Sequence, residues 1–464
     1  MKKKLLLIAL ISSTCFSLSP ASSHASAVDV GTAKQLFVDD HVVGSLEGAF
    51  RMLNQPVKHE GNPIIELKPA QKVGSADKVV VMGNVLYDED EGLYKMWYDA
   101  ANYDWGSVHL AYATSRDGIH WDLPNLGLLE YQGSKDNNFV FFDAGRGEVA
   151  AGVFKDPVAK DPQRLYKMLY HMHDSPGLGT SENGIGVAFS PDGIYWTPGE
   201  EILVPRGGDA GTLVYDPLGE GYIASTRRYE TIMDHFVIGW KGYRRVIALS
   251  TSQDFVHWTP LKTVLKPDDF DDPRDQMYVM TPFAYGNQYL GFIGMLHSST
   301  ELGPTQLASA RDLEDWRRVG RREEFLPVGA PGSWDGAWSS LSGNPPILRG
   351  NTLYLWYSGR PQAHGTSGMW KSSIGIVTLR KDGFVALRSG IRGGELMTEP
   401  LEVLAPKLYL NALSYFGRVR IRVVEEVSVP NGYSFEDCNG LERADETDFE
   451  ITWGRDRKDL SSFV

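Results

Sequence analysis

Short runs of apolar and aromatic residues, each bounded by turn-forming residues, recur along most of the chain. Val79 to Leu86 is followed by a turn at Asp88-Glu89-Asp90 and then by Tyr94-Lys95-Met96-Trp97-Tyr98. The same order returns at Val149 to Phe154 and Tyr166 to Tyr170. β-Branched and aromatic runs of this length, separated by turn signals, predict strands. The pattern therefore predicts an all-β protein.

This strand–turn–strand unit occurs five times, and a third strand-like run ends each copy. The later pairs are Thr212 to Tyr215 with Tyr222 to Ala224, Tyr278 to Tyr285 with Tyr289 to Phe292, and Pro346 to Leu348 with Leu353 to Tyr357. The third runs are Val108 to Thr114, Gly184 to Phe189, Arg245 to Ser250, Thr305 to Ser309 and Ile374 to Leu379. A small sheet cannot bury both faces alone, so its copies are expected to stack.

A turn signature marks the end of four copies. Ser115-Arg116-Asp117-Gly118-Ile119-His120-Trp121 recurs with changes at Ser190 to Trp196, Ser252 to Trp258 and Ala310 to Trp316, and Lys381 to Phe384 is a last echo. Ser and Asp side chains accept backbone N–H groups, Gly permits positive φ, and Trp suits the gap between neighbouring sheets. We interpret this signature as structural.

The five copies predict a five-bladed β-propeller over residues 28–390. The repeat stops near Gly390, whereas Leu408 to Leu410 and Val419 to Val424 still look like strands. Residues 391–464 are therefore expected to form a small C-terminal β-rich appendage.

The N-terminus is typical of an export signal. Three lysines precede an apolar run from Leu5 to about Leu18, and Ala25-Ser26-Ala27 is a small-residue cleavage site. Residues 1–27 are therefore interpreted as a signal peptide, and the mature chain is expected to be secreted or periplasmic. No later stretch approaches the roughly 20 apolar residues that a bilayer requires, so no membrane span is expected.

Charge and cysteine content narrow the function classes. The formal net charge is −13, and an acidic surface repels phosphate backbones, so nucleic acid is not an expected partner. Cys15 leaves with the leader, and a lone Cys438 allows neither an intrachain disulfide nor a thiolate cluster. No His-x-x-His or comparable ligand cluster occurs, so a zinc site is not expected. No cofactor is predicted, although a structural cation could occupy the central shaft. The oligomeric state is left open.

One acidic residue stands just ahead of the first strand of every copy. In a propeller this position borders the central funnel, so a ring of carboxylates is predicted. Cleavage of a glycosidic bond needs one carboxyl group to protonate the leaving oxygen and another to activate water or to attack the anomeric carbon. The alternative is that the acids cap strands or hold a structural cation in the shaft. The five residues are Asp77, Glu148, Asp209, Asp275 and Asp335.

Basic and aromatic residues supply candidate substrate contacts. The side chains of Arg227, Arg228, Arg360 and His364 suit a sugar bearing carboxylate or sulfate, since Arg offers a bidentate fork, although salt bridges between blades are an alternative. Asp40, which precedes the first blade, is a further binding candidate. His171 and His173 alternate along a strand, so at most one of them faces the funnel. Aromatic faces for sugar stacking are available at Trp105, Trp334, Trp338 and Trp370.

One acidic residue in a motif similar to a catalytic one is assigned a structural role instead. Phe154-Lys155-Asp156-Pro157 is similar to a catalytic Arg-Asp-Pro. Aligning the repeats, however, puts Asp156 level with Asp88 and Asp216, in the outward hairpin turn. Asp156 is therefore predicted to be a turn residue.

The leader, Leu36-Phe37-Val38-Asp39-Asp40, the Tyr94 to Tyr98 strand and the Ser-x-Asp-Gly turns resemble secreted bacterial proteins related to the N-terminal propeller of glycoside hydrolase family 32. The clan of that family includes the family 43 arabinanases and xylosidases. By position, the resemblance implies Asp77 as base or nucleophile, Glu148 as pKa modulator and Asp209 as general acid. The invertase signature Trp-x-Asn-Asp-Pro-Asn-Gly is absent, which argues against fructans.

Three functions follow as hypotheses. The first is a secreted glycoside hydrolase that cleaves a polysaccharide or oligosaccharide with a pair of funnel carboxylates. The second is a non-catalytic glycan-binding propeller. The third is a sialidase-like enzyme, which requires three converging arginines, for which the sequence offers Arg227, Arg228 and Arg360. Phosphorolysis is disfavoured, because export removes the phosphate pool.

Overall fold

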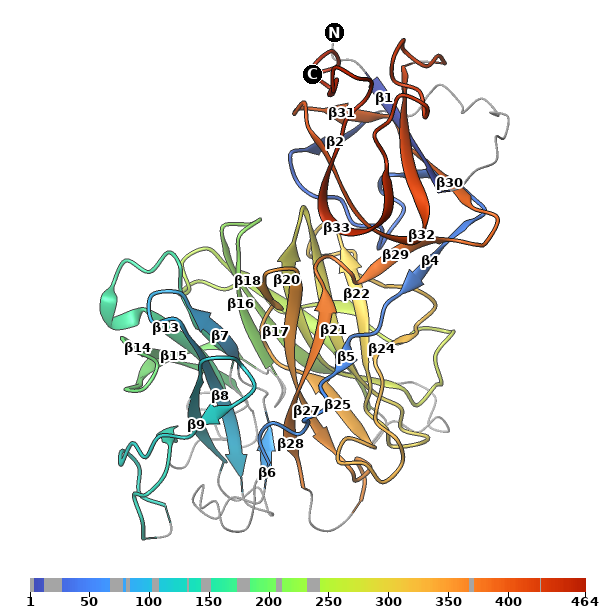
Figure 1. The fold of residues 1–464 in the computed structure, drawn as a ribbon. Helices are drawn as coiled ribbons and strands as arrows, with labels where there is room; N and C mark the ends of the chain where they lie inside the picture. Colours follow the sequence, from blue (N-terminus) through green and yellow to red (C-terminus); the bar gives the residue numbers. More distant parts are fainter. Residues whose placement is uncertain are drawn as a thin grey trace. The chain divides into compact units, whose positions relative to one another are not determined.

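The chain is almost entirely β-structure and forms two compact units (Figure 1). A computed structural model describes residues 4–11, 27–66, 78–80, 84–101, 108–131, 133–142, 152–172, 184–205, 211–231, 243–366, 371–425 and 427–464. Unit 1 comprises Met1–Asn54 and Arg380–Val464, and unit 2 comprises Gln55–Leu379. In the described ranges the one helical element is a single 3₁₀ turn, Pro162–Arg164.

The described strands of unit 2 form five antiparallel sheets, one for each predicted copy. The first holds β6 (Lys78–Val80), β7 (Val85–Asp88), β8 (Leu93–Ala101), β9 (Val108–Ser115), β10 (Trp121–Asp122) and β11 (Phe139–Phe141), and the second β12 (Gly152–Lys155), β13 (Tyr166–Met172), β14 (Gly184–Ser190) and β15 (Thr197–Pro205). The third holds β16 (Gly211–Asp216), β17 (Gly221–Thr231), β18 (Tyr243–Ser252) and β19 (Lys262–Leu265). The fourth holds β20 (Gln276–Tyr285), β21 (Gln288–Leu296), β22 (Thr305–Ala310), β23 (Arg317–Arg318) and β24 (Glu324–Leu326), and the fifth β25 (Trp338–Leu341), β26 (Ile347–Arg349), β27 (Thr352–Arg360), β28 (Ser373–Arg380) and β5 (Val57–Lys58).

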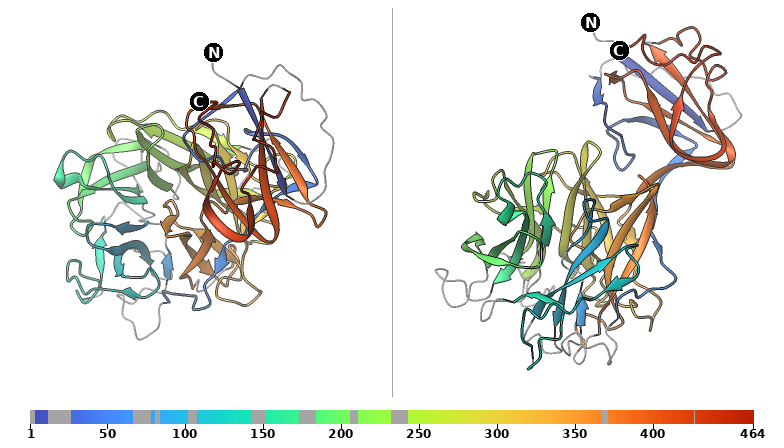
Figure 2. Two further views of the ribbon diagram at one scale, coloured as in Figure 1. Left: turned by 45° about the horizontal axis from the view of Figure 1, so that its top comes forward. Right: turned by 60° about the vertical axis from the view of Figure 1, so that its left-hand side comes forward.

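The sheets of unit 2 follow one another in chain order around a common centre, as the left view of Figure 2 shows. The fifth sheet packs against the first, which closes the ring of sheets. The Trp356 ring contacts Tyr94, with 5.7 Å between ring centroids. The fifth sheet also takes its outer strand, β5, from the start of the unit. The predicted all-β, propeller-type fold is confirmed.

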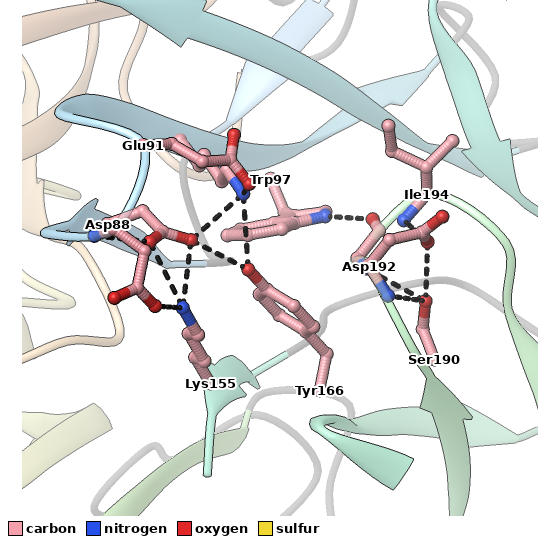
Figure 3. Close-up of polar contacts among 11 residues, drawn as sticks. Asp88, Glu91, Trp97, Lys155, Tyr166, Ser190, Asp192 and Ile194 are labelled. Atoms are coloured by element: carbon pink, nitrogen blue, oxygen red, sulfur yellow. Dashed lines mark hydrogen bonds and ion pairs between the residues drawn. The ribbon is translucent and has the colours of Figure 1, made fainter. Parts of the chain in front are cut away.

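The turn signature at the end of the third strand of the second sheet packs against the first sheet (Figure 3). In the second sheet, Ser190 Oγ accepts the N–H of Gly193 at 2.8 Å, and Asp192 Oδ1 accepts the N–H of Ile194 at 2.9 Å. The carbonyl of Gly193 then accepts a 2.7 Å hydrogen bond from Trp97 Nε1 of the first sheet. The signature is structural, as predicted.

A second repeated contact joins the hairpin turn of one sheet to the second strand of the next. Tyr166 Oη donates to Asp88 at 3.0 Å (Figure 3), and Tyr222 Oη donates to Asp156 at 2.9 Å. Tyr289 Oη donates to Asp216 in the same way. The prediction that Asp156 is a turn residue is confirmed, and its carboxylate also pairs with Lys167.

Unit 1 combines strands from both ends of the chain. Its larger sheet holds β1 (Lys4–Ile11), β2 (Val28–Gly31), β3 (Val43–Glu47), β30 (Gly394–Thr398), β31 (Leu401–Val403), β32 (Leu408–Glu425) and β33 (Leu441–Ile451), and β4 (Ala49–Leu53) pairs with β29 (Val385–Ser389). The strands between residues 28 and 54, which the sequence pattern did not separate from the propeller, thus belong with the C-terminal residues. β1, from the segment interpreted as leader, pairs with β30, β31 and β32, and Ile8 is fully buried. Among the described residues, no helix is long and apolar enough to cross a membrane.

A candidate arginine-lined site

The three acids with predicted catalytic roles are not among the residues that the structure describes. Asp77, Glu148 and Asp209 fall in the gaps between the described ranges, as do His173, Trp105 and Trp370. Their roles therefore stay predictions. The other candidates are described, and their surroundings differ.

The two remaining acids of the predicted ring are both buried in unit 2. Asp335 Oδ2 lies 2.6 Å from Lys58 Nζ of β5 and accepts a 3.0 Å hydrogen bond from Tyr357 Oη of β27, which links two strands of the fifth sheet. Asp275 Oδ2 lies 3.0 Å from His297 Nδ1, and its buried Oδ1 has no hydrogen-bond partner in the described part of the chain. Asp335 thus serves the interior of the unit, while Asp275 retains an unused acceptor.

Asp40 belongs to unit 1, whereas the other candidates belong to unit 2. Its side chain is 79% exposed and pairs with Arg51. Arg51 also donates to the main-chain carbonyls of Phe37 and Asp39. The contacts of Asp40 are thus those of a surface turn.

Residues of β17 and β18 place two arginines on one face of the third sheet. Antiparallel partners share a face and neighbours alternate, so the register that pairs Tyr229 with Arg245 puts both on the same face as Arg227. Arg228 and Arg244 consequently point the other way. Arg228 is exposed and its Nη1 lies 3.4 Å from the Leu261 carbonyl.

Tyr278 of β20 meets the arginine-bearing face. The guanidinium carbons of Arg227 and Arg245 lie 4.3 and 5.2 Å from the centroid of its ring. Arg227 is 1% exposed and Arg245 is 9% exposed, while Tyr278 itself is half-buried. Arg245 Nη1 also donates to Gln276 Oε1 at 2.6 Å, which fixes its position.

The fifth sheet completes the group. Trp338 of β25 meets Tyr278 edge-on at 5.1 Å between centroids, and the Arg360 guanidinium carbon lies 4.3 Å from the Trp338 ring. His364 follows β27, with its ring centroid 5.5 Å from that of Tyr278 and its Nδ1 3.6 Å from Glu301 Oε2. We call Arg227, Arg245, Arg360, Tyr278, Trp338 and His364 the arginine cluster.

The arginine cluster stabilises the anionic form of an acid within it and disfavours additional positive charge. Burial alone would raise the pKa of Tyr278, yet the charge and hydrogen bonding of Arg227, with the charges of Arg245 and Arg360, lower it below the ordinary value. Burial, together with the three guanidinium charges, lowers the pKa of His364 to about 3. Burial likewise lowers the pKa of Arg360 to about 10. At neutral pH His364 is therefore uncharged, and the three arginines carry the positive charge.

A buried ionisable residue also recurs at one position of the second strands. Five residues after the first tyrosine of β8, β13 and β17 stand Asp99, His171 and Arg227, each buried. The corresponding residue of β21 is Gly294, so the fold itself does not need a charged group there. Within the described ranges, no group of three His, Cys, Asp or Glu side chains is arranged to hold a metal ion.

The sequence identified part of the cluster. Arg227, Arg360, His364 and Trp338 were candidates, and the structure brings them together. It places Arg245, not Arg228, beside Arg227, and it adds Tyr278. Cross-strand pairing of Tyr229 with Arg245 is the signal that would have identified Arg245, but it requires the register of β17 and β18.

No family model and no curated protein matches the chain. Solved structures resemble it in part. A glycoside hydrolase structure is 15% identical, with 73% of this chain and 95% of that chain covered and a TM-score of 0.49. A glycosyl hydrolase from Bacteroides ovatus is 16% identical, with 75% and 97% covered and a TM-score of 0.47. A β-1,2-mannobiose phosphorylase from Listeria innocua is 14% identical, with 70% and 96% covered and a TM-score of 0.46.

Proposed function

We propose that this protein is a glycoside hydrolase that acts on an oligosaccharide or polysaccharide outside the cytoplasm. The observation that carries the proposal is the arginine cluster, where cationic and aromatic side chains from three sheets of a propeller converge. Sugars are bound by aromatic faces together with a few well-placed polar groups. Tyr278, Trp338 and the arginines supply both kinds of group in unit 2.

Hydrolysis requires two carboxyl groups with different roles. We assign the base or nucleophile to Asp77 and the general acid to Asp209, with Glu148 raising the pKa of the acid by like-charge repulsion. The arginine cluster contributes binding and orientation, because a fixed substrate reacts at a lower entropic cost. His364 is uncharged at neutral pH and is not assigned as the proton donor.

The test is turnover in acid-to-amide variants. We expect Asp77→Asn and Asp209→Asn each to reduce the release of reducing ends from the active polysaccharide at least about a hundredfold, since each removes one partner of the acid–base pair. The substrate is found by screening plant and marine polysaccharides with the purified mature protein. Asp161→Asn, at an exposed turn, is the matched control.

The thermal midpoint separates loss of function from loss of fold. It should stay within a few degrees of wild type in all three variants. Full activity in both Asp77→Asn and Asp209→Asn would reject the assigned acids.

A glycan-binding protein without catalysis is the second candidate. Asp335 favours this candidate. It is one of the five acidic residues at equivalent positions of the repeats, and its contacts with Lys58 and Tyr357 give it a structural role. Calorimetry against oligosaccharides that are recovered uncut would support this candidate. Released reducing ends would reject it.

A further inference from the structure

Arg245 is the member of the arginine cluster whose contacts point to a ligand. It is 9% exposed, yet its contacts are the neutral amide of Gln276 and the rings of Tyr229 and Tyr278, with no carboxylate among the described residues. Its Nε has no hydrogen-bond partner in that part of the chain. A buried guanidinium normally has an anionic partner, because the desolvation of a charge exceeds what aromatic contacts return.

The approach to Arg245 is lined by an accessible aromatic face. Tyr229 stands directly opposite Arg245 in the β17–β18 pair and is 45% exposed, and the guanidinium carbon lies 5.8 Å from its ring centroid. Tyr278, whose ring centroid lies 5.2 Å from the Arg245 guanidinium carbon, is also partly exposed. A sugar ring stacked on Tyr229 would therefore bring a substituent to the guanidinium.

We propose that Arg245, with Tyr229 as stacking platform, forms a subsite for a sugar ring that carries an oxyanion, either a uronate carboxylate or a sulfate ester. Arg227 and Arg360 raise the positive potential at this subsite, and Gln276 holds Arg245 in place while donating to Ser298 Oγ at 2.8 Å. This inference rests on the proposed carbohydrate function and adds the class of substrate.

Binding of charged and neutral monosaccharides tests the subsite. We expect methyl β-D-glucuronide or glucose 6-sulfate to bind at least about tenfold more tightly than methyl β-D-glucoside at low salt, because a charge-assisted hydrogen bond separates them. The preferred anion distinguishes carboxylate from sulfate. Rising salt should reduce the preference, as it does for accessible charge pairs.

A matched pair of variants isolates Arg245. Arg245→Gln should reduce the affinity for the anionic sugar by about 10- to 100-fold and the affinity for the neutral sugar by at most about threefold, because only the anionic sugar loses a charge-assisted hydrogen bond. Arg244→Gln is the control, because Arg244 is adjacent on β18, faces the other way and donates to the carbonyls of Pro267 and Pro273. Tyr229→Ser, at a surface residue, should weaken both sugars, which keeps the test valid if Arg245→Gln fails to fold.

The outcomes separate the two proposals. Equal binding of charged and neutral sugars, or an unchanged preference in Arg245→Gln, would overturn the subsite. If a neutral glycan is also cut, the hydrolase proposal stands without the subsite. If the anionic sugar binds through Arg245 but no glycan is cut, the subsite stands and the hydrolase proposal fails.

Discussion

Asp88 shows how a single buried carboxylate holds two sheets together. Its side chain is 1% exposed and lies 3.0 Å from both Lys95 Nζ of its own sheet and Lys155 Nζ of the next. Tyr166 Oη donates to the same carboxylate. Burial alone would raise the pKa of Asp88, but the hydrogen bonds from both lysines and Tyr166 hold it well below the ordinary value. The ionised form is therefore part of the fold.

The first prediction concerns stability. Asp88→Asn should lower the free energy of unfolding by about 3 kcal/mol, because it removes the buried carboxylate that pairs with Lys95 and Lys155 and leaves Lys95 with only the half-exposed Glu91 as its ion-pair partner. Urea denaturation followed by tryptophan fluorescence measures the change. Asp161→Asn, whose carboxylate is half-exposed, should change it by less than about 1 kcal/mol. An Asp88→Asn protein as stable as wild type would contradict this role.

The second prediction concerns pH and the pair of His297 with Asp275. The hydrogen bond that His297 donates to the Asp275 carboxylate raises the pKa of His297 above its ordinary value, against the effect of burial. The stabilisation is therefore complete below about pH 6.5 and is lost as pH rises through the raised pKa of the folded state. The stability difference between wild type and His297→Gln, measured by urea denaturation from pH 5 to 9, should shrink with rising pH. A constant difference would show that His297 is not protonated in the fold.

Residue roles set by local geometry were predictable from the sequence, and those set by register were not. The turn roles of Asp192 and Gly193 follow from adjacent residues. Asp156 could be placed by aligning the repeats. Arg245 and Tyr278 instead come from different sheets, and only the pairing of β17 with β18 and the packing on β20 bring them together.

At the scale of elements, side-chain size is complementary between neighbouring sheets. Where the second strand of one sheet carries a large residue, the turn of the next sheet carries a small one, and the reverse also occurs. In the first sheet, Trp97 packs on Gly193, where an added Cβ would lie 2.5 Å from the Trp97 Cζ2 atom. In the second sheet, the corresponding strand residue is Leu169, and the third-sheet turn supplies Phe255 instead of glycine. Phe255 adopts φ of 64° and is buried, so a large residue is tolerated at this turn when the strand residue is smaller.

The third prediction is a double-mutant cycle at this interface. Trp97→Leu should cost roughly 2–4 kcal/mol by leaving a cavity, and Gly193→Phe should destabilise by overlap with Trp97. The double variant should be more stable than the sum of the single changes by at least about 1 kcal/mol. Gly133→Ala measures backbone strain alone, because Gly133 has φ of 81° and nothing within 4 Å of an added Cβ. Additive changes in the free energy of unfolding would contradict this size complementarity.

At the scale of the whole molecule, the predicted cleavage of the leader conflicts with the place of β1 in the sheet of unit 1. Cleavage after Ala27 would remove β1, whose register places it between β30 and β32 in unit 1. The repeat pattern predicted the propeller because five copies carry the same strand pattern and four of them end in the turn signature. The composition of unit 1 was beyond prediction, since its strands come from both ends of the chain and share no repeat.

The fourth prediction decides between leader and strand. We propose that the exported protein begins near Val28, so its intact mass should equal that of residues 28–464. Unit 1 should then lose the strand between β30 and β32 and bind a hydrophobic dye more strongly than the full-length chain. An exported protein that keeps residues 4–11 would show that β1 is a permanent part of unit 1.

The pairing of β5 with β28 sets a limit on folding during synthesis. Asn62, near β5, exchanges hydrogen bonds with the main chain of Ile376, 314 residues further along. Contacts at such separation carry the full entropic cost of loop closure and are made late. When only the first four sheets have left the ribosome or the export channel, the ring of sheets cannot close. Assistance by chaperones should therefore matter most until the fifth sheet emerges.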